Sequence, residues 1–367
     1  LLASSAASDV YKRQVFICDN VKKRVPGSSM YTVYTDDDGN TTGEDFKGEN
    51  LITGTIKGVA ENRTPTVYFL SGHGEKSLDS YTKFTTNLTN YNYTAKELNL
   101  SETDSVPDDA ALVLVAAPSK DITDAEAEKL NAYLDNGGNI SLLMSPNGGA
   151  FAYTNLEAIM KDYGFYMDYD RVSETNSNYH ISGDKYTIQC ELNELDDDSE
   201  ATDLTSSLLN QGLYTFMPES RSFRYNDEGG KYTIAPLITT YDSAEGEPYG
   251  GISDDPEKQS GQMLLAADST SIARNDSKMV VFGNAEFIDD EHVSDDTVIV
   301  PVYLFLSTIS WMYDSDIDME ISTKSTTNDY ISLQDAGFAK GLMVVLTVIP
   351  VAIMAAGIGI WIKRRNS

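Results

Sequence analysis

"ALVLVAAPSKDITDAEAEKLNAYLDNGGNISLLM", from Ala111 to Met144, holds two apolar runs with an amphipathic segment between them. The runs at Ala111–Ala117 and Ile140–Met144 are short and almost wholly apolar, as strands covered on both faces of a sheet must be. Between them, Thr123 and Glu126 form a capping-box pattern, apolar residues recur at helical spacing, and two glycines end the pattern. Strand, helix and strand of these lengths predict two parallel strands joined by a right-handed crossover.

The same alternation continues on both sides of this stretch. A strand is predicted at Thr66–Leu70, a helix from about Leu78 to Thr89, and a strand near Tyr93–Leu98. A further helix is predicted at Thr154–Tyr163. We therefore predict an α/β fold with a doubly wound, mostly parallel sheet, in one domain over residues 64–313.

The pattern changes between about residues 172 and 261. Short β-like pieces alternate there with acidic or glycine-rich turns, which predicts an antiparallel β insertion. Apolar strands then return at Met263–Ala267 and Met279–Gly283, and a helix follows from about Val298 to Met312. We expect these elements to complete the same sheet.

The C-terminal end predicts a membrane anchor. Residues Leu342 to Ile362 carry no charge, and at about 1.5 Å per residue they would span a hydrocarbon core of about 30 Å. Pro350 is tolerated in such a helix, and Trp361 stands where an interfacial aromatic belongs. Three basic residues follow at once: Lys363, Arg364 and Arg365. Because positive charge marks the cytoplasmic side, we expect a cell-membrane protein with residues 363–367 in the cytoplasm and the main domain outside it, joined by a polar tether at 314–341.

The N-terminal end is interpreted differently. Asp9–Gln14 reads as a translated sequencing adaptor, so we expect residues 1–14 to be an assembly artefact outside the fold. Residues 15–63 are expected to be the remnant of an upstream region with a lead-in helix. The native protein is then expected to begin further upstream and to carry a second span there.

Composition excludes several classes of function. The formal net charge of −30 disfavours nucleic acid and anionic headgroups as partners. Two cysteines, Cys18 and Cys190, are too few for a disulfide-stapled scaffold. No phosphate-binding loop is present, and no cofactor is predicted.

The loop Gly72-His73-Gly74-Glu75 follows the first predicted strand of the sheet. Ligands of doubly wound folds collect at such strand ends, and a flavodoxin-like order would bring Pro118 and Ser119 beside it. One interpretation is a hydrolase site, with His73 meeting Ser119 and Glu75 nearby. The other is structural: His73 is partly buried and hydrogen-bonded to backbone or to a neighbouring loop around Ala117–Ser119. Glu75 then lies before the first turn of the next helix, where its negative charge interacts favourably with the helix N-terminus.

The inventory of nucleophiles argues against the hydrolase. The position after Met144 reads Ser-Pro-Asn-Gly-Gly, without the nucleophile elbow that such a sheet would need. Metal sites are equally poorly indicated. Asp36, Asp38 and Asn40 resemble a calcium loop, but the required glycine and final glutamate are missing, and the acidic run from Asp196 to Glu200 lacks ligand spacing. No catalytic, cofactor or metal residue is therefore assigned.

Three stretches together resemble a known family. They are "GENLITGTIKGVAENRTPTVYFLSGHGE" (48–75), "LVLVAAPSKDITDAEAEKLNAYLDNGGNISLLMSP" (112–146) and "VVFGNAEFIDDE" (280–291). They are similar to the GldG-like auxiliary proteins of ABC transporters, known from gliding motility. The resemblance covers most of residues 48–362, and it transfers Gly72, His73, Gly74 and Glu75 as signature positions without a chemical role.

The resemblance implies a fold like that of class I glutamine amidotransferases without their catalytic cysteine. It also implies a membrane complex with an ABC-2 type permease and an ATPase. We therefore expect a non-catalytic, membrane-anchored accessory subunit of an ABC transporter. The alternatives are a surface-anchored hydrolase using His73 and Glu75, and a sensor that binds a small extracytoplasmic ligand.

Overall fold

The computed structural model describes residues 13–18, 21–35, 41–46, 48–60, 64–148, 151–195, 201–209, 214–226, 230–249, 259–293, 296–313, 324–325, 361 and 364–365. The chain divides into two compact units, Leu1–Thr32 with Phe46–Lys324, and Val33–Asp45 with Ser325–Ser367. Within the described residues, no helix is both long enough and apolar enough to cross a bilayer. The predicted span Leu342–Ile362, including Pro350, lies outside the described residues except for Trp361.

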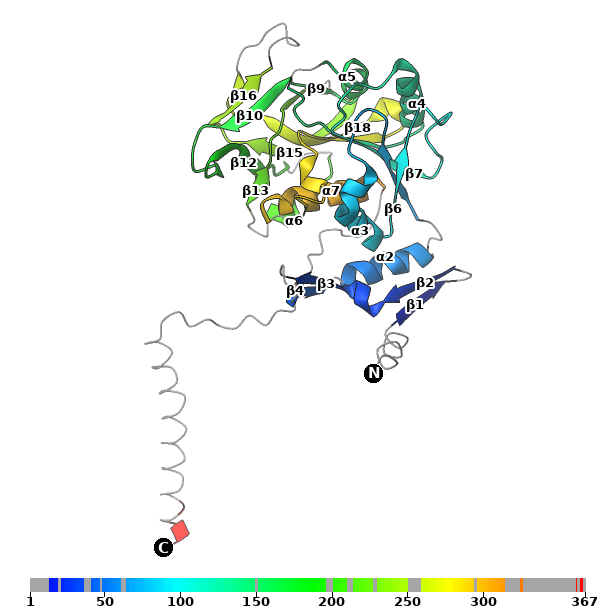
Figure 1. Ribbon diagram of the computed structural model, residues 1–367, viewed down its shortest axis with the longest axis vertical. Helices are drawn as coiled ribbons and strands as arrows, with labels where there is room; N and C mark the ends of the chain where they lie inside the picture. The colour runs from blue at the N-terminus through cyan, green and yellow to red at the C-terminus, as the bar shows by residue number, and fades with distance from the viewer. Residues whose placement is uncertain are drawn as a thin grey trace. The chain divides into compact units, whose positions relative to one another are not determined.

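A large mixed sheet forms the centre of the first unit (Figure 1). Along its main path the strand order is β11-β12-β15-β18-β19-β8-β7-β5-β6. Its parallel part consists of β19 (Ser277–Phe282), β8 (Ile140–Leu143), β7 (Ala110–Ala116), β5 (Thr66–Leu70) and β6 (Thr94–Leu98). Its antiparallel part consists of β18 (Leu264–Ser271), β15 (Tyr232–Thr240), β12 (Asp184–Leu192) and β11 (His180–Ile181). The predicted α/β fold is confirmed, but β18 runs antiparallel to β19, so the sheet is mixed.

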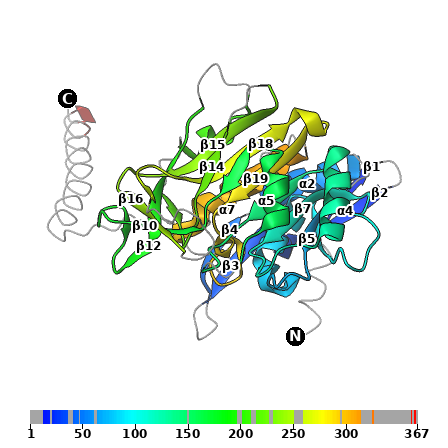
Figure 2. The same cartoon turned by 90° about the horizontal axis from the view of Figure 1, so that it is seen from above.

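Helices cover both faces of the parallel strands. One face carries η2 (Leu78–Tyr81), α3 (Thr82–Asn90) and α7 (Ile299–Met312), and the other carries α4 (Asp124–Asp135) and α5 (Thr154–Lys161). Figure 2 shows α4 and α5 side by side over β5 and β7. Along β7, Leu112 and Leu114 join the core under α3 and α7, whereas Val113 and Val115 join the core under α4 and α5. This alternation explains why the whole run is apolar.

The predicted insertion is antiparallel but not separate from the sheet, because β12 and β15 extend it. A second small sheet contains β10 (Asp170–Glu174), β16 (Ala244–Pro248) and β17 (Gln259–Ser260). Three short strands pair off the main path: β9 (Phe165–Met167), β13 (Thr215–Met217) and β14 (Phe223–Tyr225). The remaining helical turns are α6 (Ser206–Leu209), η3 (Ile272–Arg274), η4 (Glu286–Ile288) and η5 (Asp296–Val298).

Further elements lie outside the large sheet. β1 (Arg13–Cys18) and β2 (Val21–Pro26) make an antiparallel hairpin, followed by η1 (Gly27–Met30). A three-stranded sheet contains β20 (Lys324–Ser325), β4 (Thr41–Phe46) and β3 (Tyr31–Thr35). The expected lead-in helix is α2 (Gly48–Ala60). Both cysteines are free, so no disulfide joins these elements.

Candidate functional site

The signature loop lies where the crossovers of the sheet diverge. β5 pairs with β6 on one side and with β7 on the other. The crossover from β5 to β6 passes over the face covered by α3, whereas that from β7 to β8 passes over the opposite face, with α4. Gly72–Glu75 leaves the carboxyl end of β5, and Pro118 and Ser119 leave that of β7. The fold therefore places both loops at its switch point, where ligands of doubly wound sheets commonly bind.

The two loops are joined through the backbone of His73. Its carbonyl oxygen accepts hydrogen bonds from Ser119 N at 2.8 Å, from Lys120 N at 3.1 Å and from Ser119 Oγ at 3.2 Å. Pro118 is held from the other side, because its carbonyl accepts the Tyr153 hydroxyl at 2.6 Å. The predicted contact between His73 and the neighbouring loop is confirmed, with the His73 carbonyl as the acceptor.

Glycine is required at position 74 for two reasons. Gly72 and Gly74 have φ values of +110° and +86°, in the region that disfavours other residues. A Cβ atom on Gly74 would also lie 1.7 Å from Ser119 Oγ. The close contact between the loops therefore depends on the missing side chain of Gly74.

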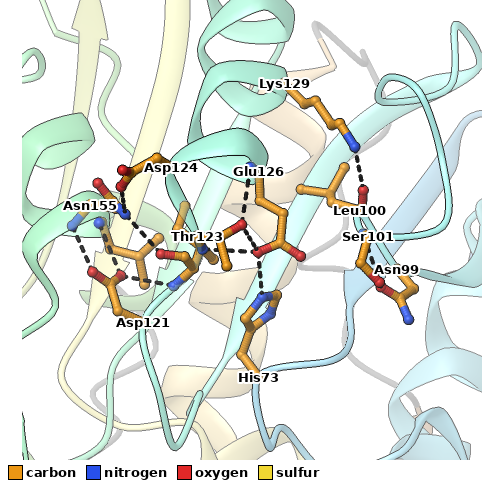
Figure 3. A network of polar contacts seen from close by, with 12 residues as sticks. His73, Asn99, Leu100, Ser101, Asp121, Thr123, Asp124, Glu126, Lys129 and Asn155 are labelled. Atoms are coloured by element: carbon orange, nitrogen blue, oxygen red, sulfur yellow. Dashed lines mark hydrogen bonds and ion pairs between the residues drawn. The ribbon is translucent and has the colours of Figure 1, made fainter.

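The imidazole of His73 lies between two carboxylates on buried side chains, and Figure 3 shows its contact with one of them, Glu126. His73 is 3% exposed, and its Nε2 is 3.1 Å from Glu126 Oε2. Its Nδ1 is 3.3 Å from Glu75 Oε1, on a side chain that is 2% exposed. We call these three residues the His73 clamp.

Glu126 also begins helix α4. Its Oε2 accepts hydrogen bonds from Thr123 N at 2.9 Å and from Thr123 Oγ1 at 2.6 Å, and Thr123 Oγ1 accepts from the Glu126 N–H. The capping box predicted from the sequence is thus confirmed. The same carboxylate oxygen binds His73, so the start of α4 is tied directly to the signature loop.

Glu75 precedes the helical turn that begins at Leu78, as predicted, but its carboxylate binds His73 instead of that helix N-terminus. Its Oε2 accepts the His73 backbone N–H at 2.7 Å, and its other oxygen faces the imidazole. The N–H of Leu78, at the start of the next helical turn, donates instead to Glu97 Oε1 at 2.9 Å. Pairing with a buried imidazole outweighed the weaker attraction of an exposed helix end.

Electrostatics favour the charged forms of His73 and Glu126. The adjacent Glu75 carboxylate raises the pKa of His73 above its ordinary value; burial opposes this effect, and Glu126 adds to it. Burial raises the pKa of Glu126, but the Thr123 hydrogen bonds and His73 outweigh burial and lower it. The clamp therefore favours an imidazolium between carboxylates.

The clamp offers little to a nucleophilic mechanism. Within the described part of the chain, the contacts of the imidazole nitrogens are with carboxylate oxygens. The Ser119 hydroxyl donates to the His73 carbonyl rather than to the ring. Ser145, at the end of β8, accepts the Ala285 N–H through its Oγ at 3.0 Å. The arrangement is a buried ion-pair network that connects the signature loop to the start of α4.

Lys76 connects the signature loop to the segment after β19. Its Nζ lies 2.6 Å from Asp289 Oδ2, and Asp289 Oδ1 lies 2.8 Å from His292 Nδ1. Asp289, Glu291 and His292 are close enough together to hold a metal ion. Asp289 is already engaged by two cationic or hydrogen-bonding partners, so this cluster is better explained as an ion-pair network. The calcium-like residues Asp36, Asp38 and Asn40 lie outside the described residues.

Sequence reasoning missed the residues that complete this edge of the sheet. The sequence explains Glu126 locally as part of a capping box, and it carries no signal that links Glu126 to His73, 53 positions away. Arg221 lies in the insertion, where the strands are too short for the sequence to predict their pairing.

Of the residues predicted to flank the membrane span, Arg365 lies 5.3 Å over the Trp361 ring, and Arg364 is helical.

These features define the class of protein: an α/β domain with a doubly wound core whose switch point is closed by buried ion pairs. The chain belongs to the family described as ABC-type uncharacterized transport system, which matches residues 64–301. The predicted resemblance to GldG-like auxiliary proteins is confirmed at this level, and the chain is an auxiliary component of an ABC transport system.

Solved structures support the fold alone. The "mmIFT52 N-terminal domain" matches with a TM-score of 0.52 and 17% sequence identity, over 68% of this chain and 99% of that one. The exo-beta-1,4-mannosidase Op5Man5 from Opitutaceae bacterium strain TAV5 has a TM-score of 0.34 and 9% identity, over 77% of this chain and 41% of the mannosidase. The second likeness is too weak to carry an argument. No curated protein matches the chain significantly.

Proposed function

We propose that this chain is a non-catalytic, membrane-anchored accessory subunit that binds the permease and ATPase of an ABC transporter. The observation that carries the proposal is the His73 clamp. The side chains of His73 and Glu75 make contacts inside the domain. His73 is only 3% exposed, and its two ring nitrogens lie next to the carboxylates of Glu75 and Glu126. The family match supports the transport context.

The clamp weighs against the rival hydrolase. A general base must reach its substrate and be largely neutral at the working pH. His73 is buried, and Glu75 and Glu126 raise its pKa, which stabilises the imidazolium that cannot accept a proton. The signature loop then acts by fixing the relative positions of β5, β7 and α4, so that the domain presents a rigid surface.

The anchoring part of the proposal rests on the sequence. An uncharged stretch of 21 residues, Leu342 to Ile362, followed by Lys363, Arg364 and Arg365, has the length and flanking charge of a span that ends in the cytoplasm. The α/β domain would then lie outside the cytoplasm. Its amidotransferase-like character, implied by the resemblance, belongs to the same proposal.

Co-purification tests the accessory role. The tagged full chain is extracted from its native membranes in a mild non-ionic detergent, and the bound proteins are identified by mass spectrometry. We expect an ABC permease and an ATPase to be recovered together in fixed ratio, and to be absent when an unrelated single-span protein carries the tag. A chain that elutes alone under these conditions contradicts the proposal.

A separate assay addresses the rival. Purified chain and the His73→Ala variant are compared on panels of glycan and peptide substrates. We expect no turnover by either protein. Hydrolysis by the native chain that disappears in a folded His73→Ala variant would establish the hydrolase instead.

A further inference from the structure

Arg221 is the largest fully buried side chain in the described part of the molecule, with 0% exposure. Its Nη2 donates to the Ser145 carbonyl at 3.0 Å. Its Nε and Nη1 are buried and have no hydrogen-bond partner among the described residues. Buried charges and buried N–H groups are paired as a rule, because leaving them unpaired is costly. The guanidinium is therefore incomplete without a further acceptor.

Burial lowers the pKa of Arg221, and the surroundings do not neutralise its guanidinium. The rings of Tyr153 and Tyr169 flank the guanidinium, each with its centroid 5.5 Å from Cζ. Within the described residues, no carboxylate lies within ion-pair distance of Arg221. The oxygens of nearby Asp170 accept from Ser222 N at 2.9 Å and from Ser222 Oγ at 2.8 Å, and burial raises the pKa of this carboxyl. Asp170 is thus a poor counter-ion.

The backbone holds Arg221 at the edge where a ligand is expected. Arg221 N donates to the Gly283 carbonyl at 3.0 Å, just beyond the end of β19. A Cβ atom on Gly283 would lie 2.2 Å from the Arg221 carbonyl oxygen, so the two segments are in close contact. Ser145, the partner of Nη2, follows β8. The guanidinium consequently lies at the carboxyl ends of two parallel strands.

The unused hydrogens define what the site can bind. The Ser145 carbonyl takes one of the two Nη2 hydrogens, and the other lies on an edge shared with either Nε or Nη1. One two-pronged edge therefore lacks an acceptor, and such an edge matches two oxygens of one carboxylate or phosphate. We propose that Arg221 binds a small oxyanion, through a carboxylate or phosphate group, at the carboxyl ends of β8 and β19.

Buried water is the competing explanation. Water would accept hydrogen bonds from the free N–H groups, but it would leave the guanidinium without a counter-ion. An oxyanion supplies both the acceptors and the negative charge. The inference is independent of the accessory role, because an oxyanion could bind whether or not a permease does.

Thermal unfolding of the full chain in non-ionic detergent tests the site, with sodium phosphate and sodium acetate as separate probes. Sodium chloride keeps the ionic strength constant. We expect the unfolding temperature to rise and saturate with at least one probe; phosphate alone indicates a phosphate ligand, and acetate alone indicates a carboxylate. Arg221→Lys keeps the charge but loses the fork, and it should need at least about tenfold more anion.

Arg224→Met is the matched control. The Arg224 side chain is 66% exposed and pairs with Asp168 at 2.8 Å, so its loss removes one positive charge close to the site in sequence. This variant should respond to the anion as the native chain does. An unchanged response in Arg221→Lys, or the absence of saturation with both probes, overturns the proposal.

Equilibrium dialysis covers the case in which Arg221→Lys does not fold. One equivalent of labelled phosphate or acetate should bind per native chain, and the Arg224→Met variant should retain it. Binding of neither anion overturns the proposal without any variant of Arg221.

Discussion

At the scale of single residues, the most informative side chain is His73, because two buried carboxylates depend on its charge. Glu75 and Glu126 lie 3.3 and 3.1 Å from its ring nitrogens. Removing one partner of a buried ion pair typically costs about 3–5 kcal/mol, since the remaining charges stay buried. We predict that His73→Ala lowers the free energy of unfolding by about this amount near pH 6, measured by urea denaturation.

The pH dependence of this loss follows from the pKa shifts. The pKa of His73 is raised from 6.5, so its stabilisation is fully present below about that pH and disappears as the pH rises through the folded-state value. The pKa of Glu126 is lowered from 4.5, so the stability that its charge contributes disappears as the pH falls through the folded-state pKa of Glu126. The difference in free energy of unfolding between the native chain and His73→Ala should be largest between the folded-state pKa values of Glu126 and His73. It should be smaller at pH 9. A difference that stays constant from pH 5.5 to pH 9 would contradict the charged clamp.

At the scale of elements, the close approach of the loops after β5 and β7 should be sensitive to one methyl group. Gly74→Ala places a Cβ atom 1.7 Å from Ser119 Oγ at a φ of +86°. Gly183 has nearly the same φ, +87°, with nothing within 4 Å of an added Cβ atom. Gly183→Ala should therefore report only backbone strain, roughly 1–2 kcal/mol, and Gly74→Ala should lose about 1–3 kcal/mol more from overpacking.

A double variant separates the two contributions. Ser119→Gly removes the atoms that the new methyl group would meet, so it should recover part of the loss in Gly74→Ala. Denaturation of the single and double variants gives the coupling between the two positions. Equal losses in Gly74→Ala and Gly183→Ala, with no coupling to Ser119, would show that the loops do not depend on this contact.

The elements themselves were largely predictable, because their signals are local. The runs at β5, β7 and β8 show burial on both faces, and the Thr123 capping box marks the start of α4. The direction of β18 was not predictable, since an apolar run is the same whichever way the strand runs. The partner of His73 was hidden for a related reason: Glu126 already satisfies a complete local pattern, and only the packed sheet brings it to the loop.

At the scale of the whole molecule, the dominant property is charge. The chain has 57 acidic and 27 basic side chains, a formal net charge of −30. Repulsion among exposed charges destabilises a compact state, and salt screens it as the Debye length falls from about 30 Å at 0.01 M to about 8 Å at 0.15 M. The described surface ion pairs have the opposite dependence on salt, but each contributes only about 0–1 kcal/mol.

We predict that the free energy of unfolding rises when sodium chloride is increased from 10 to 200 mM, because screened repulsion outweighs the weakened surface pairs. Urea is the suitable denaturant, since it adds no ions. His73→Ala provides the internal comparison: its clamp is buried, and buried pairs are screened far less than exposed ones. The loss caused by His73→Ala should therefore be nearly the same at both salt concentrations, while both proteins gain stability in parallel. If the native chain loses stability as salt increases, surface ion pairs dominate its response. If the loss caused by His73→Ala becomes smaller as salt increases, His73 is in contact with solvent.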